Sequence, residues 1–382
     1  MSLKKTNHAA ELKRRCVLTP ASSFLLDLIR IIAAQSVLLG HLLKYLGAYP
    51  ADRQYPYIQS LAVTVFVLLS GFLTMYSFMS KRETSPDYGL QQYMSARFIR
   101  IYGGLLPALL IVAALDRAQM HLTDIYPYAS NYNIETFLAN VLILYNFPAF
   151  KFIPLLHKQP FGSARPLWTL SVEWWLYILF GLLVYSQPNM RKKPLYWMAL
   201  AFSAIVPLTN LIYGNHNGIS FAWLLGILVC YVLFSDSGTT LRMQKWQCYS
   251  VGMASLVLAW LRICKIHTSF LKYNVIMDYD PLYSALLAFA MFFFLKATQT
   301  ESAIQTREKV VKIIASYSYS LFLTHYSCVD LICHTFRSRT HKYQMALAIF
   351  ILCNVVGALV HVLLEKPTVQ MLRRFCQRVN NK

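Results

Sequence analysis

Ten long apolar stretches, separated by short polar or charged segments, account for most of the chain. Each is close to the roughly 20 residues that a helix needs to cross the hydrocarbon core of a bilayer. The pattern therefore predicts an all-α fold, a polytopic bundle of about ten transmembrane helices. The predicted spans are 22–43, 58–80, 98–115, 167–186, 195–213, 219–235, 247–264, 281–297, 313–336 and 343–364.

One further apolar run, 134–150, differs from these ten. It is short, contains Pro148 and follows a polar loop rich in tyrosine. Inside a membrane every backbone polar group must be satisfied within the segment or by neighbouring protein. We therefore expect this run to be interfacial or re-entrant rather than spanning.

Composition agrees with a multi-pass membrane protein. Of the 382 residues, 57% are hydrophobic and only 14% are charged, whereas about 25% are charged in an average soluble domain. The net charge of +20 could indicate a nucleic-acid partner. The basic residues lie at the chain ends and between the apolar runs, so the positive-inside rule explains them better, and we expect no nucleic acid.

The distribution of Lys and Arg also predicts the orientation of the chain. With the N-terminus in the cytoplasm, the cytoplasmic segments hold 23 of these residues and the opposite segments hold 12. This bias favours cytoplasmic placement of both termini and puts the longest loop, 116–166, outside.

Three regions follow from this topology. Residues 1–21 form a basic cytoplasmic segment before an uncleaved first span, and residues 22–366 form the transmembrane domain. Residues 367–382 form a short basic tail in the cytoplasm, suited to anionic lipid headgroups. Glu365-Lys366-Pro367 is interpreted as an ordinary helix stop.

The first span carries Asp27, Arg30 and His41, although charges inside a membrane are costly and mark functional candidates. Arg30 and His41 are eleven residues apart. Eleven steps of about 100° return to within about 20° of the same helix face and advance about 16 Å along the axis. Asp27 lies one turn before Arg30, close enough to neutralise it. One face of this helix thus presents a cation at one depth and a base at another.

Arg97 and Arg100 open the third span at its predicted cytoplasmic end. Two arginines one turn apart form a fork suited to phosphate oxygens. Arginines at this position also serve as topological anchors that extend to the lipid surface. The pattern alone supports both interpretations.

The fourth and ninth spans carry further buried polar groups. Glu173 has no cation beside it in the sequence, so it either pairs with another helix or is protonated. We expect it at a depth comparable to that of His41. The ninth span has a run of hydroxyls typical of interhelical hydrogen bonds or a polar cavity wall. His325, in that run, is more often a satisfied buried histidine than a catalyst, and Asp330 has no interpretation.

Several classes of site are absent from the sequence. It contains no metal signature, no Walker motif, no dinucleotide fingerprint and no nucleophile elbow, so we expect no metal cofactor. The eight cysteines form no CxxC pair. Several lie within apolar runs, which indicates buried thiols rather than disulfides.

Taken in order, six short motifs resemble the acyltransferase-3 family of integral membrane O-acyltransferases. They are spread over most of the chain, and their order makes the resemblance specific. The matching residues are Leu26, Asp27, Arg30 and His41; Ser70 to Phe72; Arg97 to Tyr102; Leu167 to Glu173; Tyr319 to His325; and Glu365 to Pro367.

The resemblance implies transfer of an acyl group, commonly acetyl, from acyl-CoA to a hydroxyl. Family acceptors are mostly glycans of the cell surface, free or lipid-linked, which implies a multi-pass protein of the cell's inner or plasma membrane. The charged residues supply a mechanism consistent with that transfer, in which Arg97, Arg100 and Arg30 bind acyl-CoA, Arg30 is also a catalytic candidate, and His41 is the general base. Glu173 orients His41 or positions the sugar.

Two rival functions use the same polar residues. A transporter or flippase that exports a glycan or lipid-linked sugar would also need intramembrane Arg, His and Glu. The chain shows no paired Gly- or Pro-broken spans in matching halves, which such transporters often have. A lipid or ligand sensor without chemistry would not need His41.

Overall fold

The structure, a computed structural model, describes nine stretches of the chain: 16–47, 58–85, 87–153, 156–213, 218–235, 241–265, 280–299, 308–336 and 342–380. In these stretches the regular elements are all helices, with no strand. A long helix lies at each predicted span: α2 (Pro20–Tyr45), α3 (Ile58–Thr84), α4 (Leu90–Leu122), α6 (Trp168–Tyr185), α8 (Pro194–Tyr213), α9 (Ile219–Phe234), α11 (Lys245–Lys265), α12 (Pro281–Thr298), α13 (Glu308–Thr335) and α14 (Lys342–Val360).

The all-helical, multi-pass membrane architecture is therefore confirmed. Among the described residues, seven helical stretches are long and apolar enough to cross a bilayer. The count of ten spans and the orientation of the termini stay predictions. Of the predicted basic segment 1–21, residues 1–15 lie outside the described residues.

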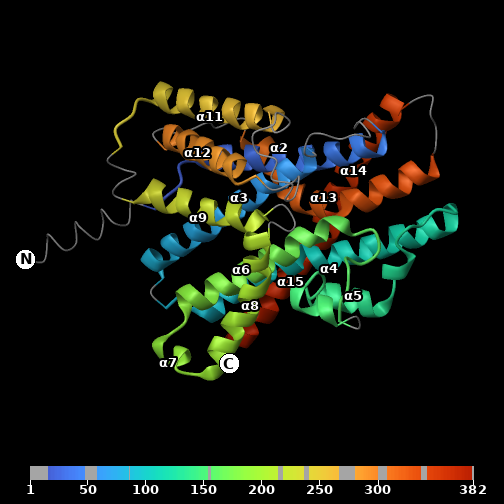
Figure 1. The fold of residues 1–382 in the computed structure, drawn as a ribbon, viewed down its shortest axis with the longest axis horizontal. Coiled ribbons are helices and arrows are strands. Elements are labelled where there is room, and N and C mark those ends of the chain that lie inside the picture. The colour runs from blue at the N-terminus through green and yellow to red at the C-terminus, as the bar shows by residue number, and fades with distance from the viewer. Residues whose placement is uncertain are drawn as a thin grey trace, which may run out of the picture.

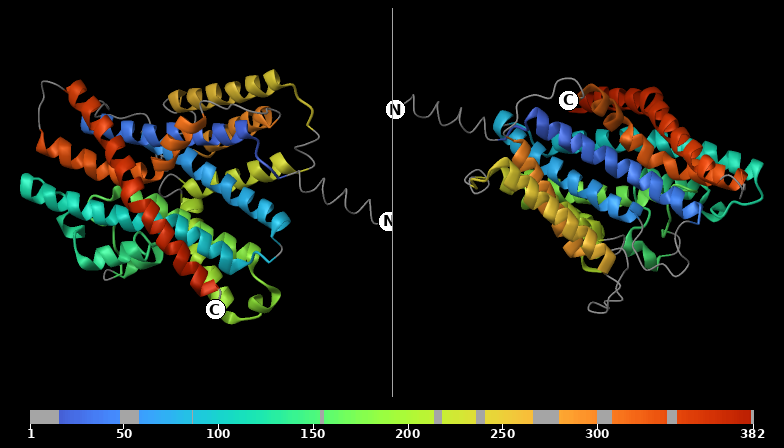
Figure 2. Two further views of the ribbon diagram at one scale, coloured as in Figure 1. Left: turned by 180° about the vertical axis from the view of Figure 1, so that it is seen from behind. Right: turned by 90° about the horizontal axis from the view of Figure 1, so that it is seen from above.

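The long helices pack around a centre formed by α2, α3, α4, α6 and α13. Seen from above they run roughly alongside one another (Figure 2), and α11 pairs with α12 at one edge of the bundle (Figure 1). Glycine permits the close contact of α3 with α9. A Cβ on Gly71 would lie 2.0 Å from the Trp223 carbonyl oxygen, and one on Gly226 would lie 2.0 Å from that of Leu68. Gly71 of the Ser-Gly-Phe motif therefore lets two helices approach.

The start of α2 is fixed by its own cap and by a neighbouring helix. Pro20 occupies the first helical turn, and the Thr19 hydroxyl accepts a hydrogen bond from the Ser22 backbone nitrogen at 3.1 Å. Both are common helix-start features. Thr19 also donates to the Thr298 carbonyl at the end of α12, at 2.9 Å. These bonds set the depth at which α2 enters the bundle, and hence the depths of Arg30 and His41.

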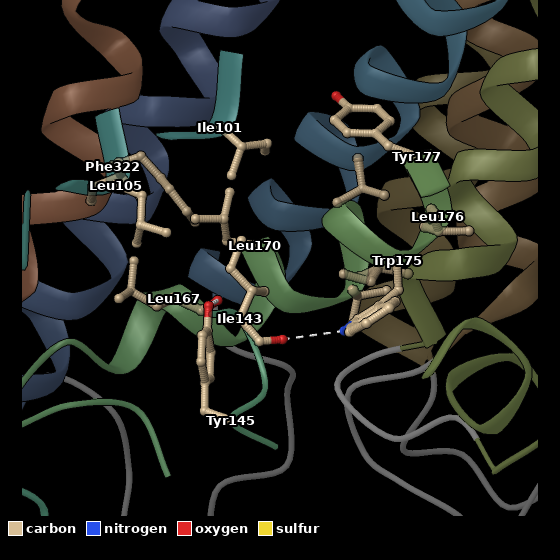
Figure 3. Close-up of a cluster of buried hydrophobic side chains, with 14 of the residues drawn as sticks. Ile101, Leu105, Ile143, Tyr145, Leu167, Leu170, Trp175, Leu176, Tyr177 and Phe322 are labelled. Atoms are coloured by element: carbon tan, nitrogen blue, oxygen red, sulfur yellow. Dashed lines mark hydrogen bonds between the residues drawn. The ribbon is translucent and has the colours of Figure 1, made fainter. Parts of the chain in front are cut away.

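The segment between α4 and α6 folds back onto the helices. It holds four short elements, none long enough to span a membrane: η1 (Ala129–Asn131), α5 (Ile134–Val141), η2 (Pro148–Phe152) and η3 (Arg165–Leu167). Its side chains Ile143, Tyr145 and Phe147 are buried in the core. As Figure 3 shows, the indole nitrogen of Trp175 on α6 donates to the Ile143 carbonyl, at 3.3 Å. The segment is thus part of the core, and it covers one end of α6.

The C-terminal region differs from the prediction, because the helix stop expected at Glu365-Lys366-Pro367 is wrong. A π-helical turn, η5 (His361–Glu365), joins α14 to a further helix, α15 (Lys366–Asn380). Pro367 lies in the first turn of α15, where its missing N–H costs little. Residues 366–380 therefore form a helix that packs on α4. The two helices approach closely, since a Cβ on Gly103 would lie 2.4 Å from Val369.

Topology can be tested on the exposed Ser130 of η1. In a background stripped of the native thiols, Ser130→Cys is expected to react with a membrane-impermeant maleimide in intact cells. The reason is the Lys and Arg bias, which puts this segment outside. Lys192→Cys, after the short helix α7 (Pro188–Arg191), is the matched control and should react only in opened cells. The reverse pattern would overturn the orientation.

Candidate functional site

Helix α2 carries the two charged groups and the base predicted from the sequence. The guanidinium Nη1 of Arg30 donates to the Asp27 carboxylate at 2.9 Å, which forms the expected ion pair. Arg30 and His41 line two separate cavities, called here the arginine cavity and the histidine cavity. One helix thus contributes a cation to one chamber and an imidazole to another.

The arginine cavity has a volume of about 220 Å³ and lies between α2, α3, α4, α6 and α13. Arg30, Arg97 and Arg100 all line it, so the structure brings together the three predicted donor-binding residues. The Arg97 guanidinium lies over the rings of Tyr93 and Tyr177, with carbon-to-centroid distances of 5.1 and 4.9 Å. Such cation–π contacts hold a guanidinium in place while leaving N–H groups for a ligand.

Glu173 also lines the arginine cavity, and not the histidine cavity. Its carboxylate accepts hydrogen bonds from the hydroxyls of Ser70 and Tyr177, both at 2.5 Å. The structure thus places Glu173 beside the arginines, in a different cavity from His41, and its role toward His41 stays a prediction. Trp168 lines the histidine cavity, and five further residues of helix advance about 7.5 Å along α6 to Glu173.

A third chamber, the C-terminal cavity, lies where α4 meets α15. Its volume is about 380 Å³, and Arg100 lines both this cavity and the arginine cavity. Helix α15 contributes Lys366, Gln370 and Arg373. Sequence reasoning missed this cluster because it treated the residues after Glu365 as a tail. The signal was available, since Lys366 and Arg373 are seven residues apart and share a helix face.

The histidine cavity has a volume of about 500 Å³, and most of the residues that line it carry polar side chains. A side chamber of about 270 Å³ shares Asn146, Gln159 and Trp168 with it. This side chamber continues between α8 and the segment that joins α4 to α6, called here the covering segment. Asn146 has a left-handed backbone with φ of 53°, which asparagine adopts more readily than most residues. The remaining lining of the histidine cavity is His41, Lys44, Ser60, Tyr128, Asn131, Pro160, Gly162, Arg165, Pro166 and Tyr326.

A short row of aromatic rings lies between the arginine cavity and the histidine cavity. Phe66 and Phe322 line the arginine cavity with their centroids 5.4 Å apart. The Phe322 ring lies 6.1 Å from that of His325, which in turn lies 5.2 Å from the ring of His41. One aromatic layer therefore separates the arginines from the imidazole that faces the histidine cavity.

Asp330, which the sequence left without interpretation, ties the covering segment to the bundle. Its carboxylate accepts hydrogen bonds from the hydroxyls of Tyr45 on α2 and Tyr128 in the covering segment. Tyr128 also shares a 3.1 Å hydrogen bond with Tyr326. Removing Asp330 would take an acceptor from the Tyr45 hydroxyl and leave Tyr128 bonded to Tyr326 alone, so its role here is to hold one wall of the histidine cavity.

The acyltransferase-3 family model, described as an acyltransferase domain, matches residues 25–365. No curated protein and no solved structure matches the chain.

Proposed function

Because the chain belongs to the acyltransferase-3 family, which it matches over residues 25–365, we propose that it is a membrane-bound O-acyltransferase. It moves an acyl group, acetyl in the simplest case, from cytoplasmic acyl-CoA to a hydroxyl of a cell-surface glycan. One observation carries the proposal. Arg30 and His41 project from one helix into two chambers that are separated by a single aromatic layer. A donor with a charged head and a distant reactive end fits that arrangement.

The donor's charged head would bind between the C-terminal and arginine cavities. Arg100 faces both, with Arg373 and Lys366 on one side and Arg97 on the other. Arginine forks bind phosphate oxygens with two parallel hydrogen bonds, and these bonds are strong because both partners are charged. The pantetheine arm would then run past Arg30 toward Phe66, placing the thioester beside the aromatic layer.

Chemistry would occur at His41, with the thioester passing between the rings of this layer so that its carbonyl carbon faces the histidine cavity. The acceptor hydroxyl gives its proton to neutral His41 as its oxygen attacks the thioester carbonyl carbon. The carbon–sulfur bond then breaks, and the CoA thiolate takes the proton back from the imidazolium. Atoms and charge balance with an ester and free CoA as products.

The acceptor would occupy the histidine cavity. Sugars present a hydroxyl on nearly every carbon, and the side-chain amides of Asn131, Asn146 and Gln159 can both donate to and accept from them. Trp168 adds an aromatic face at the boundary with the side chamber. Two joined chambers of this kind suit an acceptor longer than one sugar.

Purified protein incubated with radiolabelled acetyl-CoA and cell-surface glycan tests the proposal directly. Transfer of label to the glycan is expected. Movement of glycan across proteoliposomes without CoA, in the absence of label transfer, would instead support a transporter. Comparing the glycans of cells with and without the gene then identifies the acceptor.

Arg97→Ala and Arg100→Ala are each expected to weaken acyl-CoA binding about 10-fold or more while the protein stays folded. Each removes charged hydrogen bonds to phosphate, which contribute roughly 1.5–3 kcal/mol apiece. Equilibrium binding of labelled donor in detergent measures the effect. If both variants bind like wild type, these residues are only topological anchors.

Helix α15 offers a matched control for this prediction. Arg373 lines the C-terminal cavity, whereas its exposed neighbour Arg374 does not. Arg373→Ala should weaken donor binding, and Arg374→Ala should leave it unchanged. Equal losses of donor affinity in the two variants would mean that α15 contributes only general positive charge.

A further inference from the structure

His325 on α13 has one nitrogen that is satisfied and one that is not. The side chain is buried, with 1% of its surface exposed. Its Nδ1 lies 3.1 Å from the Leu321 carbonyl oxygen and 2.9 Å from that of Phe322. Carbonyl oxygens only accept hydrogen bonds, so Nδ1 carries the proton and Nε2 is the nitrogen with the lone pair. That Nε2 is buried and has no partner among the described residues.

His41 presents the complementary arrangement. Its Nδ1 is buried and has no hydrogen-bond partner in the described part of the chain, and the side chain lines the histidine cavity. The two imidazole centroids are 5.2 Å apart. Imidazoles joined by an N–H···N hydrogen bond have centroids about 5 Å apart, since the nitrogens are about 3 Å apart and each lies about 1 Å from its ring centre. The observed centroid distance is therefore compatible with a hydrogen bond from Nδ1–H of His41 to Nε2 of His325.

We propose that His325 is the positioning residue for His41. Its Nε2 accepts the Nδ1–H of His41, which fixes the tautomer of His41 that has Nε2 free to take a proton from the acceptor. When that proton is transferred, the same hydrogen bond strengthens and shares the positive charge of the imidazolium. A buried charge without such a partner is costly, and the third group in hydrolase triads has the same task. The inference rests on the proposed acyl transfer and fills the role that the sequence assigned to Glu173.

If His325 has a purely structural role, the other nitrogen of its ring is the important one. In that case the important group is Nδ1–H, which ties His325 to the carbonyls of its own helix. Asparagine places an N–H group near the position of Nδ1, whereas glutamine places an amide oxygen near the position of Nε2. His325→Asn and His325→Gln therefore separate the two roles.

The decisive measurement is kcat and KM of both variants, each normalised to folded protein by gel filtration. We expect His325→Asn to lower kcat roughly 10- to 100-fold, the range for losing a hydrogen bond to a charged group. Its KM for acyl-CoA should change little, since His325 does not line the arginine cavity. His325→Gln should recover most of the activity. The reverse order, with asparagine active and glutamine not, would overturn the inference.

A second measurement needs no variant of His325 to fold. Nitrogen-15 spectra of wild-type protein labelled on histidine report which nitrogen is protonated, and the His41 signals are identified by their loss in His41→Gln. Protons on Nδ1 of both rings are expected, and a proton on Nε2 of neutral His41 would contradict the inference. If wild-type protein transfers no label at all, the proposed function fails instead, and the two failures are distinct.

Discussion

His41→Ala is expected to abolish acyl transfer while donor binding stays close to wild type. A sugar hydroxyl is a poor nucleophile, and a positioned base typically contributes 10²–10⁴-fold to the rate. Neutral histidine can accept a proton at physiological pH, and alanine cannot. His41 lines the histidine cavity but not the arginine cavity, so its loss should leave the donor's phosphates bound.

The measurement is label transfer per folded molecule, alongside equilibrium binding of acyl-CoA to the same preparation. His121→Ala is the matched control, because His121 is exposed at the end of α4 and lines none of the cavities described. Near-normal transfer by His41→Ala would remove His41 as the base and the proposed mechanism with it. A loss of donor binding equal to the loss of transfer would place His41 in the donor site.

What the sequence could predict lies mostly within single helices. Arg30 and His41 share α2, so the periodicity and rise of one helix determine their relative position, and Asp27 pairs with Arg30 for the same reason. Glu173 and His325 lie on other helices. Their depths relative to His41 depend on where α6 and α13 begin and how they pack against α2, and one sequence contains no measure of either.

The C-terminal region shows a second limit of prediction from the sequence. Proline after an apolar run usually indicates a stop, because it lacks an N–H and clashes with the preceding turn. Here the π-helical turn His361–Glu365 precedes Pro367, and α15 continues beyond it. The charges of α15 were visible, but their place beside Arg100 depends on this continuation. The usual helix-ending effect of proline therefore does not hold here, because α15 packs against α4.

Arg30→Lys is expected to lower acyl-CoA affinity and transfer about 10-fold or more, although it keeps the positive charge. Arg30 uses Nη1 to bind Asp27 while its side chain also lines the arginine cavity. A guanidinium has five N–H donors in a planar fork, so it can hold Asp27 and still donate to a ligand. The single ammonium of lysine cannot reach both in the same geometry. Arg117→Lys, at an exposed position of α4, is the matched control and should behave as wild type.

The ion pair with Asp27 allows a structural alternative, in which Arg30 mainly keeps α2 in register. Breaking a buried or half-buried pair from either side leaves one charge uncompensated, so this alternative predicts equal losses of folded protein for Asp27→Asn and Arg30→Ala. A donor-binding role predicts an asymmetry instead. Arg30→Ala should lose donor affinity per folded molecule, whereas Asp27→Asn should retain most of it, because the guanidinium still faces the cavity. Binding of labelled acyl-CoA to folded protein decides between them, and equal affinity in the two variants would leave Arg30 as a structural partner of Asp27.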